Sequence, residues 1–76
     1  MESFEIKVNA EIYVVVHDNA DDCSYIVFNH KTCHVVKKGN SGLWQAVAHR
    51  FGAAFLPMAE IGAAIDEHYE QMLQNG

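Results

Sequence analysis

Two cysteines and two histidines occur within residues 23–34, whose sequence is CSYIVFNHKTCH. Thiolate and imidazole groups are the usual ligands of a tetrahedral structural zinc ion. Such sites favour a C-x2-C pair, whereas the spacing here is C-x6-H-x2-C-H, and adjacent side chains of a strand point to opposite faces. We therefore predict no metal site and no cofactor. The alternative function is a small metal-binding or thiol-based protein, with the candidate ligands Cys23, His30, Cys33 and His34.

The same stretch predicts a β-hairpin that keeps the two thiols apart. With a two-residue turn at His30 and Lys31, Cys33 lies opposite Phe28, and Cys23 lies five residues further along that strand. Five residues of strand span about 16 Å, and a disulfide requires α-carbons within about 7 Å of each other. We therefore expect no intramolecular disulfide, a buried Cys33, and a Cys23 at the edge of its strand.

Residues that support nucleophilic catalysis also occur as neighbours in the sequence. A Cys or Ser nucleophile requires a histidine that a carboxylate orients. The candidates are His17 beside Asp18, and the run of Asp66, Glu67 and His68. Adjacent side chains diverge on a strand or a helix, and the sequence lacks the G-x-G-x-x-G, P-loop and H-E-x-x-H motifs. We predict that the protein is not an enzyme and has no catalytic residue.

Length and charge argue against several classes of protein. The chain has 76 residues, half of them hydrophobic, which suits one domain over residues 1–76. Its net charge of −5 repels a phosphate backbone, and the longest basic run is Lys37 with Lys38, so we expect no nucleic-acid partner. No stretch approaches the roughly 18 apolar residues of a membrane span, and the first residues do not form a secretory signal. We expect a cytoplasmic protein without a membrane partner.

The first half of the chain has the period-two pattern of β-strands. Residues 4–8 alternate apolar and polar side chains, and Asn9 with Ala10 suits a two-residue hairpin turn that places Ile6 opposite Tyr13. Three more strands, apolar on both faces, are expected to continue the meander over residues 11–17, 24–29 and 33–38.

The second half of the chain has helical spacing. Residues 43–55 are expected to form a first helix, with a fifth strand over 43–51 as the alternative. The apolar face of that helix would hold Trp44, Val47, Ala48, Phe51 and Phe55. Pro57 suits the first turn of a second helix, with an apolar stripe at Met58, Ile61, Ile65, Tyr69 and Met72. Gly62 lets this helix approach the sheet closely. The predicted fold is α+β, an antiparallel four-stranded β-meander followed by one or two C-terminal α-helices packed on the sheet.

The predicted sheet has more apolar surface than one helix covers. A second apolar face is expected from Ile12, Val14, Val16, Val27 and Val36. Either the helix of residues 43–55 or another protein must cover it, and a symmetric dimer is a common solution. The expected partner interface consists of Ile12, Val14, Val16, Tyr25, Val27, His34 and Val36. The function favoured by the sequence is a small non-catalytic interaction module that binds a protein partner or itself as a homodimer.

Overall fold

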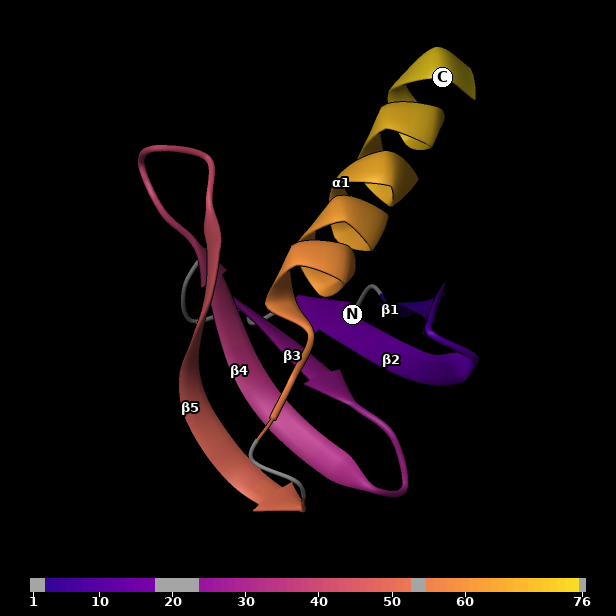
Figure 1. The fold of residues 1–76 in the computed structure, drawn as a ribbon. Helices are drawn as coiled ribbons and strands as arrows, with labels where there is room; N and C mark the ends of the chain where they lie inside the picture. The colour runs from indigo at the N-terminus through magenta and orange to yellow at the C-terminus, as the bar shows by residue number, and fades with distance from the viewer. Residues whose placement is uncertain (1–2, 18–23, 53–54, 76) are drawn as a thin grey trace.

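The computed structural model describes residues 3–17, 24–52 and 55–75. Within these residues the elements are β1 (Ser3–Val8), β2 (Glu11–His17), β3 (Ser24–Phe28), β4 (Thr32–Lys38), β5 (Trp44–Gly52) and α1 (Met58–Asn75). The strands form one antiparallel sheet in the order β1-β2-β3-β4-β5, and α1 lies on one side of it (Figure 1). The α+β class is confirmed, but the sheet has five strands instead of the predicted four, and one helix follows it.

The β1–β2 hairpin has the turn and the register that its sequence predicts. Asn9 and Ala10 both have positive φ, 52° and 69°, which is the conformation of a type I′ turn. The turn brings Ile6 opposite Tyr13. This register is confirmed, and it determines which side chains of the hairpin share a face.

The β3–β4 hairpin also has its predicted register. Phe28 pairs with Cys33, and the Asn29 N–H donates to the carbonyl oxygen of Thr32 over 3.0 Å. The Oδ1 atom of Asn29 accepts hydrogen bonds from the backbone N–H groups of Lys31 (2.8 Å) and Thr32 (3.1 Å). The Asn29 side chain thus accepts hydrogen bonds that a backbone carbonyl accepts in other turns, and residues close together in the sequence are sufficient to form this turn.

The prediction of a helix over residues 43–55 is wrong, and the alternative of a fifth strand is correct. β5 pairs with β4 through two register shifts, each of which leaves an extra residue on β5. The shifts interrupt the alternation of successive side chains between the two faces, so that side chains on one face of β5 recur at steps of three residues. These side chains are Gln45, Ala48 and Phe51. A three-residue step is also the step of a helix face, which explains the error.

Helix α1 begins where Pro57 predicts and crosses the sheet. Its first hydrogen bond runs from the Ile61 N–H to the carbonyl oxygen of Pro57 over 2.9 Å. Ile61 and Ile65 are fully buried and Tyr69 is partly buried. The C-terminal turns of α1 extend past the sheet, where Met72 is exposed (Figure 1). The predicted apolar stripe therefore packs along its first three turns and emerges into solvent at the end.

At Gly62, α1 packs directly against the side chain of Trp44 on β5. A Cβ atom on Gly62 would lie 2.4 Å from Cδ1 of Trp44, a distance that no side chain tolerates without moving the indole. The indole therefore occupies the space that glycine leaves open, and the predicted close approach of this helix to the sheet is confirmed.

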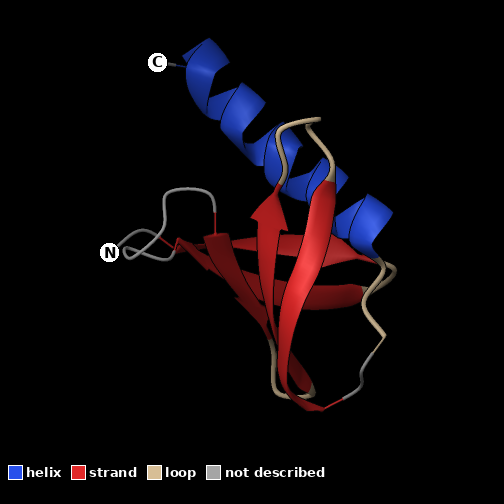
Figure 2. Ribbon diagram, turned by 90° about the vertical axis from the view of Figure 1, so that its left-hand side faces the viewer, coloured by secondary structure: helices blue, strands red, loops and turns tan. Residues whose placement is uncertain are grey.

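The two faces of the sheet have different surroundings. We call the face under α1 the covered face and the opposite one the open face (Figure 2). Helix α1 contacts both edge strands, β1 and β5, so it spans the covered face from edge to edge. The core lies between them and consists of Ile6, Val8, Tyr13, Val15, Val27 and Val36 from the sheet with Leu56, Ile61 and Ile65 from the segment above it.

Candidate functional site

The open face carries a continuous set of apolar side chains over β2, β3, β4 and β5. The registers place them side by side, for example Val14 opposite Phe28. Ile12 is 54% exposed and Phe51 50% at the two ends of the set, the side chains on β2 and β3 between them are half-buried, and Cys33 and Val35 on β4 are buried. We call the set the open-face patch: Ile12, Val14, Val16, Ile26, Phe28, Cys33, Val35, Ala48 and Phe51. None of the helices and strands in the described residues packs over it, because the one helix lies on the covered face.

The predicted partner interface falls on both faces of the sheet. Ile12, Val14 and Val16 lie on the open face, as members of the open-face patch. The remaining predicted residues, Tyr25, Val27, His34 and Val36, lie on the covered face. The expectation that the two groups share a face is wrong, because β2 and β3 pair with Val15 opposite Val27. The interface itself stays a prediction. The geometry restricts it to Ile12, Val14 and Val16 and to their neighbours on the open face.

The candidate metal ligands are not brought together by the hairpin. Cys33 is a free, buried thiol on the open face. His34 follows it and points to the covered face, and His30 is exposed in the turn. Cys23 lies outside the described residues, so neither its position nor the predicted absence of a disulfide is tested. Among the described residues, no group of three or more His, Cys, Asp or Glu side chains is arranged to hold a metal ion.

His34 is a buried side chain with structural partners. It is 1% exposed, and its Nε2 atom lies 2.7 Å from Oγ1 of Thr32. The Thr32 hydroxyl donates to the carbonyl oxygen of Phe51 over 3.2 Å, and a hydroxyl oxygen that donates its proton can also accept the Nε2–H of His34. The ring also stacks on His49, with centroids 5.0 Å apart. These contacts tie β4 to β5, and they leave the Nε2 atom engaged.

The acidic and histidine side chains of α1 that resemble catalytic residues have separate partners. Oδ1 of Asp66 accepts hydrogen bonds from Nζ of Lys38 (2.9 Å) and from the indole Nε1–H of Trp44 (3.3 Å). The His68 ring stacks on Phe4, with centroids 3.7 Å apart. Asp66 therefore joins α1 to the β4–β5 hairpin, whereas His68 joins α1 to β1, and the pair forms no proton relay.

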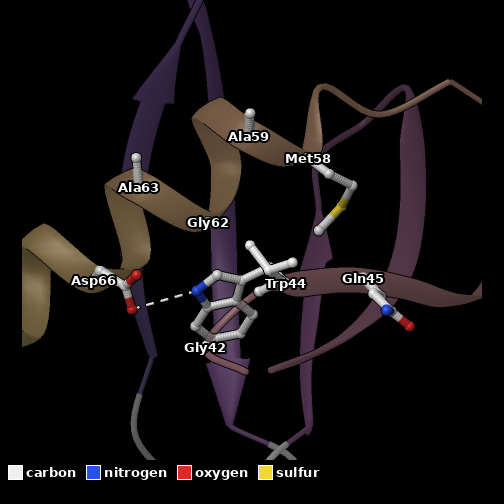
Figure 3. Close-up of a pocket in the computed structure, with 9 residues that line it drawn as sticks. Gly42, Trp44, Gln45, Met58, Ala59, Gly62, Ala63 and Asp66 are labelled. Carbon is white, nitrogen blue, oxygen red and sulfur yellow. Dashed lines mark hydrogen bonds between the residues drawn. The ribbon is translucent and has the colours of Figure 1, made fainter. Parts of the chain in front are cut away.

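A groove of about 530 Å³ lies between the first turns of α1 and the start of β5 (Figure 3). The indole of Trp44 is its aromatic surface, and Ala59 and Ala63 contribute only methyl groups to its lining. The remaining lining residues are Gly42, Leu43, Gln45, Met58, Gly62 and Asp66. The sequence prediction missed this groove, since it exists only when residues 44–52 form a strand. The signal that points to it is Gly62, whose missing side chain admits the indole.

Charge is divided between two parts of the chain. Residues 23–59 contain no acidic residue and hold four of the five basic residues, Lys31, Lys37, Lys38 and Arg50. All ten acidic residues lie outside this segment, and the helix α1 contains no Lys or Arg. β4 and β5 therefore form a basic region in a protein whose net charge is −5.

The two edge strands of the sheet differ in their protection against further pairing. β1 has six residues and carries Glu5 and Lys7, and charged side chains on an edge discourage pairing with other chains. β5 has nine residues, no proline and a single charge at Arg50, and all of its side chains except Trp44 are exposed. Of the two edges, β5 is therefore the one that favours the addition of another strand.

No protein-family model matches the chain, and no curated protein or solved structure shows a significant match to it. In the parts of the chain that the structure describes, no helix combines the length and the apolar character needed to cross a bilayer. The features of this molecule that bear on function are therefore its own faces, edges and grooves.

Proposed function

We propose that the protein is a small, non-catalytic, cytoplasmic interaction module that forms a homodimer through the open-face patch. The observation that carries this proposal is the continuity of the patch, which extends over four neighbouring strands without a described element above it. Apolar side chains gathered on one surface mark interaction sites more often than apolar residues scattered singly.

The chemistry of the open face suits a second copy of the same face. Two sheets pack face to face about 10 Å apart when apolar side chains interdigitate between them. A two-fold axis makes one patch complementary to its own copy, since each residue then meets the same surface. The β1 end of the open face carries Glu5 and Lys7, which supply a charged border to the patch. A dimer of this kind has two sheets inside and two helices outside.

The other functional classes have less support. The acidic net charge of −5 disfavours a nucleic-acid partner, and the proposal includes neither nucleic acid nor membrane. A metal-binding or thiol-based role requires ligands that converge, whereas Cys33 and His34 point to opposite faces of β4. An enzymatic role requires a nucleophile or an acid–base pair, and the partners of Asp66 and His68 are structural.

Sedimentation analysis of the wild type and of Ile12→Glu tests the proposal. A carboxylate at Ile12, which is 54% exposed on the patch, has to be buried in the dimer, so we expect the wild type to be dimeric and Ile12→Glu monomeric. Leu73→Glu is the matched control, because Leu73 is 82% exposed near the end of α1; this variant should remain dimeric.

Native mass spectrometry of the same samples separates the alternatives. We expect the mass of two chains without zinc. A wild type that stays monomeric up to about 1 mM, where association contributes no more than about 4 kcal/mol, would overturn the homodimer. A stoichiometric zinc ion that is lost in Cys33→Ser would favour the metal-binding alternative.

A further inference from the structure

We propose that the outer edge of β5 binds an extended segment of a partner protein by strand addition, and that this segment combines a carboxylate with a large apolar side chain. The apolar side chain fills the groove beside Trp44, and the carboxylate pairs with Arg50. This site lies on the edge of the sheet and is separate from the open-face patch, so it goes beyond the proposed dimer.

The backbone of β5 provides the first part of the site. β5 is the longest strand of the sheet and pairs on one side only, with β4. Eight of its nine residues are exposed, so the described residues leave its outer edge uncovered. An added strand gains affinity from main-chain hydrogen bonds to such an edge and specificity from pockets for its alternate side chains.

The groove provides the second part, a pocket beside the edge. It opens between the start of β5 and the first turns of α1, with Trp44, Met58, Ala59 and Ala63 around it (Figure 3). The one carboxylate of the groove belongs to Asp66, which already accepts hydrogen bonds from Lys38 and from the indole of Trp44. Since this charge is neutralised and the other walls are mostly apolar, the groove favours a large apolar side chain over a charged one.

Charge provides the third part and favours an acidic partner. Arg50 is exposed on β5, and within the described parts of the chain it forms no ion pair. It belongs to a segment, residues 23–59, that lacks acidic residues altogether. A strand laid along β5 therefore meets a positive edge, and a carboxylate near Arg50 gains a partner while the rest of the molecule repels acidic chains.

A partner protein fits this edge better than a second copy does. A second β5 would bring another Arg50 and no carboxylate, since β5 contains no acidic residue. A second β1 would bring Glu5, but Lys7 lies two residues away on the same face and cancels its charge. The occupant that the charges favour is therefore an acidic segment without nearby basic residues.

The spacing of the two contacts defines the segment. Trp44 and Arg50 are six residues apart on β5, but the extra residues of the two bulges shorten this span to the length of about four to five residues of β4, which is about 15 Å. In an antiparallel pair, the carboxylate therefore precedes the apolar residue by about four positions. The probe is the acetylated, amidated and fluorescein-labelled peptide Thr-Glu-Thr-Val-Thr-Leu-Thr, and its control has Lys in place of Glu.

Fluorescence anisotropy with the wild type and Arg50→Glu tests the charge contact. An exposed ion pair contributes up to about 1 kcal/mol, so the wild type should bind the Glu peptide about fivefold more tightly than the Lys peptide. Arg50→Glu should reverse this preference. Failure of both peptides to bind, or an unchanged preference in Arg50→Glu, overturns the proposal.

Two further measurements test the groove and the backbone pairing. Ala59→Phe fills the groove and should weaken binding of the Glu peptide at least fivefold, whereas Gln71→Phe, on the part of α1 that faces β1, should leave it unchanged.

The same peptide with N-methyl groups on alternate residues should not bind. Trp44, the only tryptophan, should change its fluorescence when the unmethylated peptide binds. Equal binding of the methylated peptide, or no effect of Ala59→Phe, contradicts strand addition into this groove.

The outcome separates this proposal from that of the dimer. Peptide binding should be unchanged in Ile12→Glu, because the open-face patch takes no part in it. Binding by a protein that never dimerises would overturn the dimer and support the edge site. If no peptide binds and Arg50→Glu instead lowers the sedimenting mass, β5 pairs with a second copy, and the partner-segment proposal is wrong.

Discussion

The covered and open faces of the sheet both carry valine and isoleucine side chains, but α1 packs on only one of them. Val14 and Val15 are neighbours on β2, yet Val15 is fully buried whereas Val14 is only half-buried. Val15 belongs to the core under α1, and Val14 belongs to the open-face patch. An apolar pattern along a strand therefore does not show by itself which face belongs to the core. Among the described residues, no helix or strand packs over the second apolar face.

Paired alanine substitutions at these two valines provide the strongest test of the comparison. Val15→Ala removes two buried methyl groups and leaves a cavity, so we expect the free energy of unfolding to fall by about 2–3 kcal/mol. Val14→Ala should lower the stability of the monomer by less than about 1 kcal/mol. Urea unfolding, followed by circular dichroism, measures both.

The dependence of the stability loss on protein concentration is a second measurement that should distinguish the two valines. If the open face is a dimer interface, the loss caused by Val14→Ala should grow with protein concentration, because the folded dimer is stabilised by mass action. The loss caused by Val15→Ala should be the same at each concentration. Equal losses in the two variants at all concentrations would mean that the two faces are buried alike, and the comparison would fail.

Gly62→Ala tests how closely α1 is seated on the covered face. The added methyl would lie 2.4 Å from Cδ1 and 2.8 Å from Cγ of Trp44, so the indole or the helix has to shift. Overpacking costs about 1–3 kcal/mol, and the better helix propensity of alanine offsets up to about 1 kcal/mol of it. We expect a net loss of about 1–2 kcal/mol in urea unfolding.

The sign of this effect should depend on the indole. In a Trp44→Leu background the clash with the ring is removed, and the same Gly62→Ala change should then stabilise the helix. A gain in stability from Gly62→Ala with Trp44 present would show that α1 is not held against β5 at this point.

The ion pair between Glu11 and Lys31 should have the smallest effect. Its Nζ and Oε1 atoms are 2.7 Å apart, and both side chains are exposed, so solvent screens the pair. The hydrogen bond and the charge of Lys31 lower the pKa of Glu11 from its usual value of 4.5, and Glu11 raises the pKa of Lys31 above 10.5 by the same two causes. Lys31→Gln should therefore lower the stability only slightly at neutral pH.

The pH dependence of that small loss follows from the two shifts. A lowered pKa of Glu11 stabilises the fold above pH 4.5, and this contribution disappears as the pH falls through the lowered pKa. The raised pKa of Lys31 stabilises the fold below pH 10.5, and this contribution disappears as the pH rises through the raised pKa. The urea midpoints of the wild type and Lys31→Gln should differ near pH 7 and converge as the pH falls through the lowered pKa of Glu11. A difference that persists in acid would contradict this assignment.

Both hairpins and the long helix could be predicted from local sequence. Asn9 and Ala10 form the expected turn, and Asn29 closes the second turn through its own side chain. Pro57 precedes the first turn of α1. These features depend on residues close together in the chain, so propensity and turn chemistry are sufficient to find them.

The pairing of distant segments could not be predicted in the same way. The two bulges on β5 place side chains of one face three residues apart. A helix face has the same spacing, so the sequence of residues 43–55 resembles that of a helix. The offset between β2 and β3 decides that Val14, not Val15, joins the open face. If β3 paired with β2 one residue out of this register, every side chain of β3 would lie on the opposite face of the sheet. The composition of the loop that connects the two strands does not determine this register.

The two hairpin registers, the amphipathic helix and the excess of apolar side chains in the strands can be found in the sequence. These follow from steric limits on a few adjacent residues and from the periods of strand and helix. The assembled fold is needed to show which apolar face α1 covers, that Trp44 lies under Gly62, and that β5 forms a basic edge that no described element covers. Each of these depends on contacts between segments far apart in the chain, whose free energy becomes available only when the whole sheet is assembled.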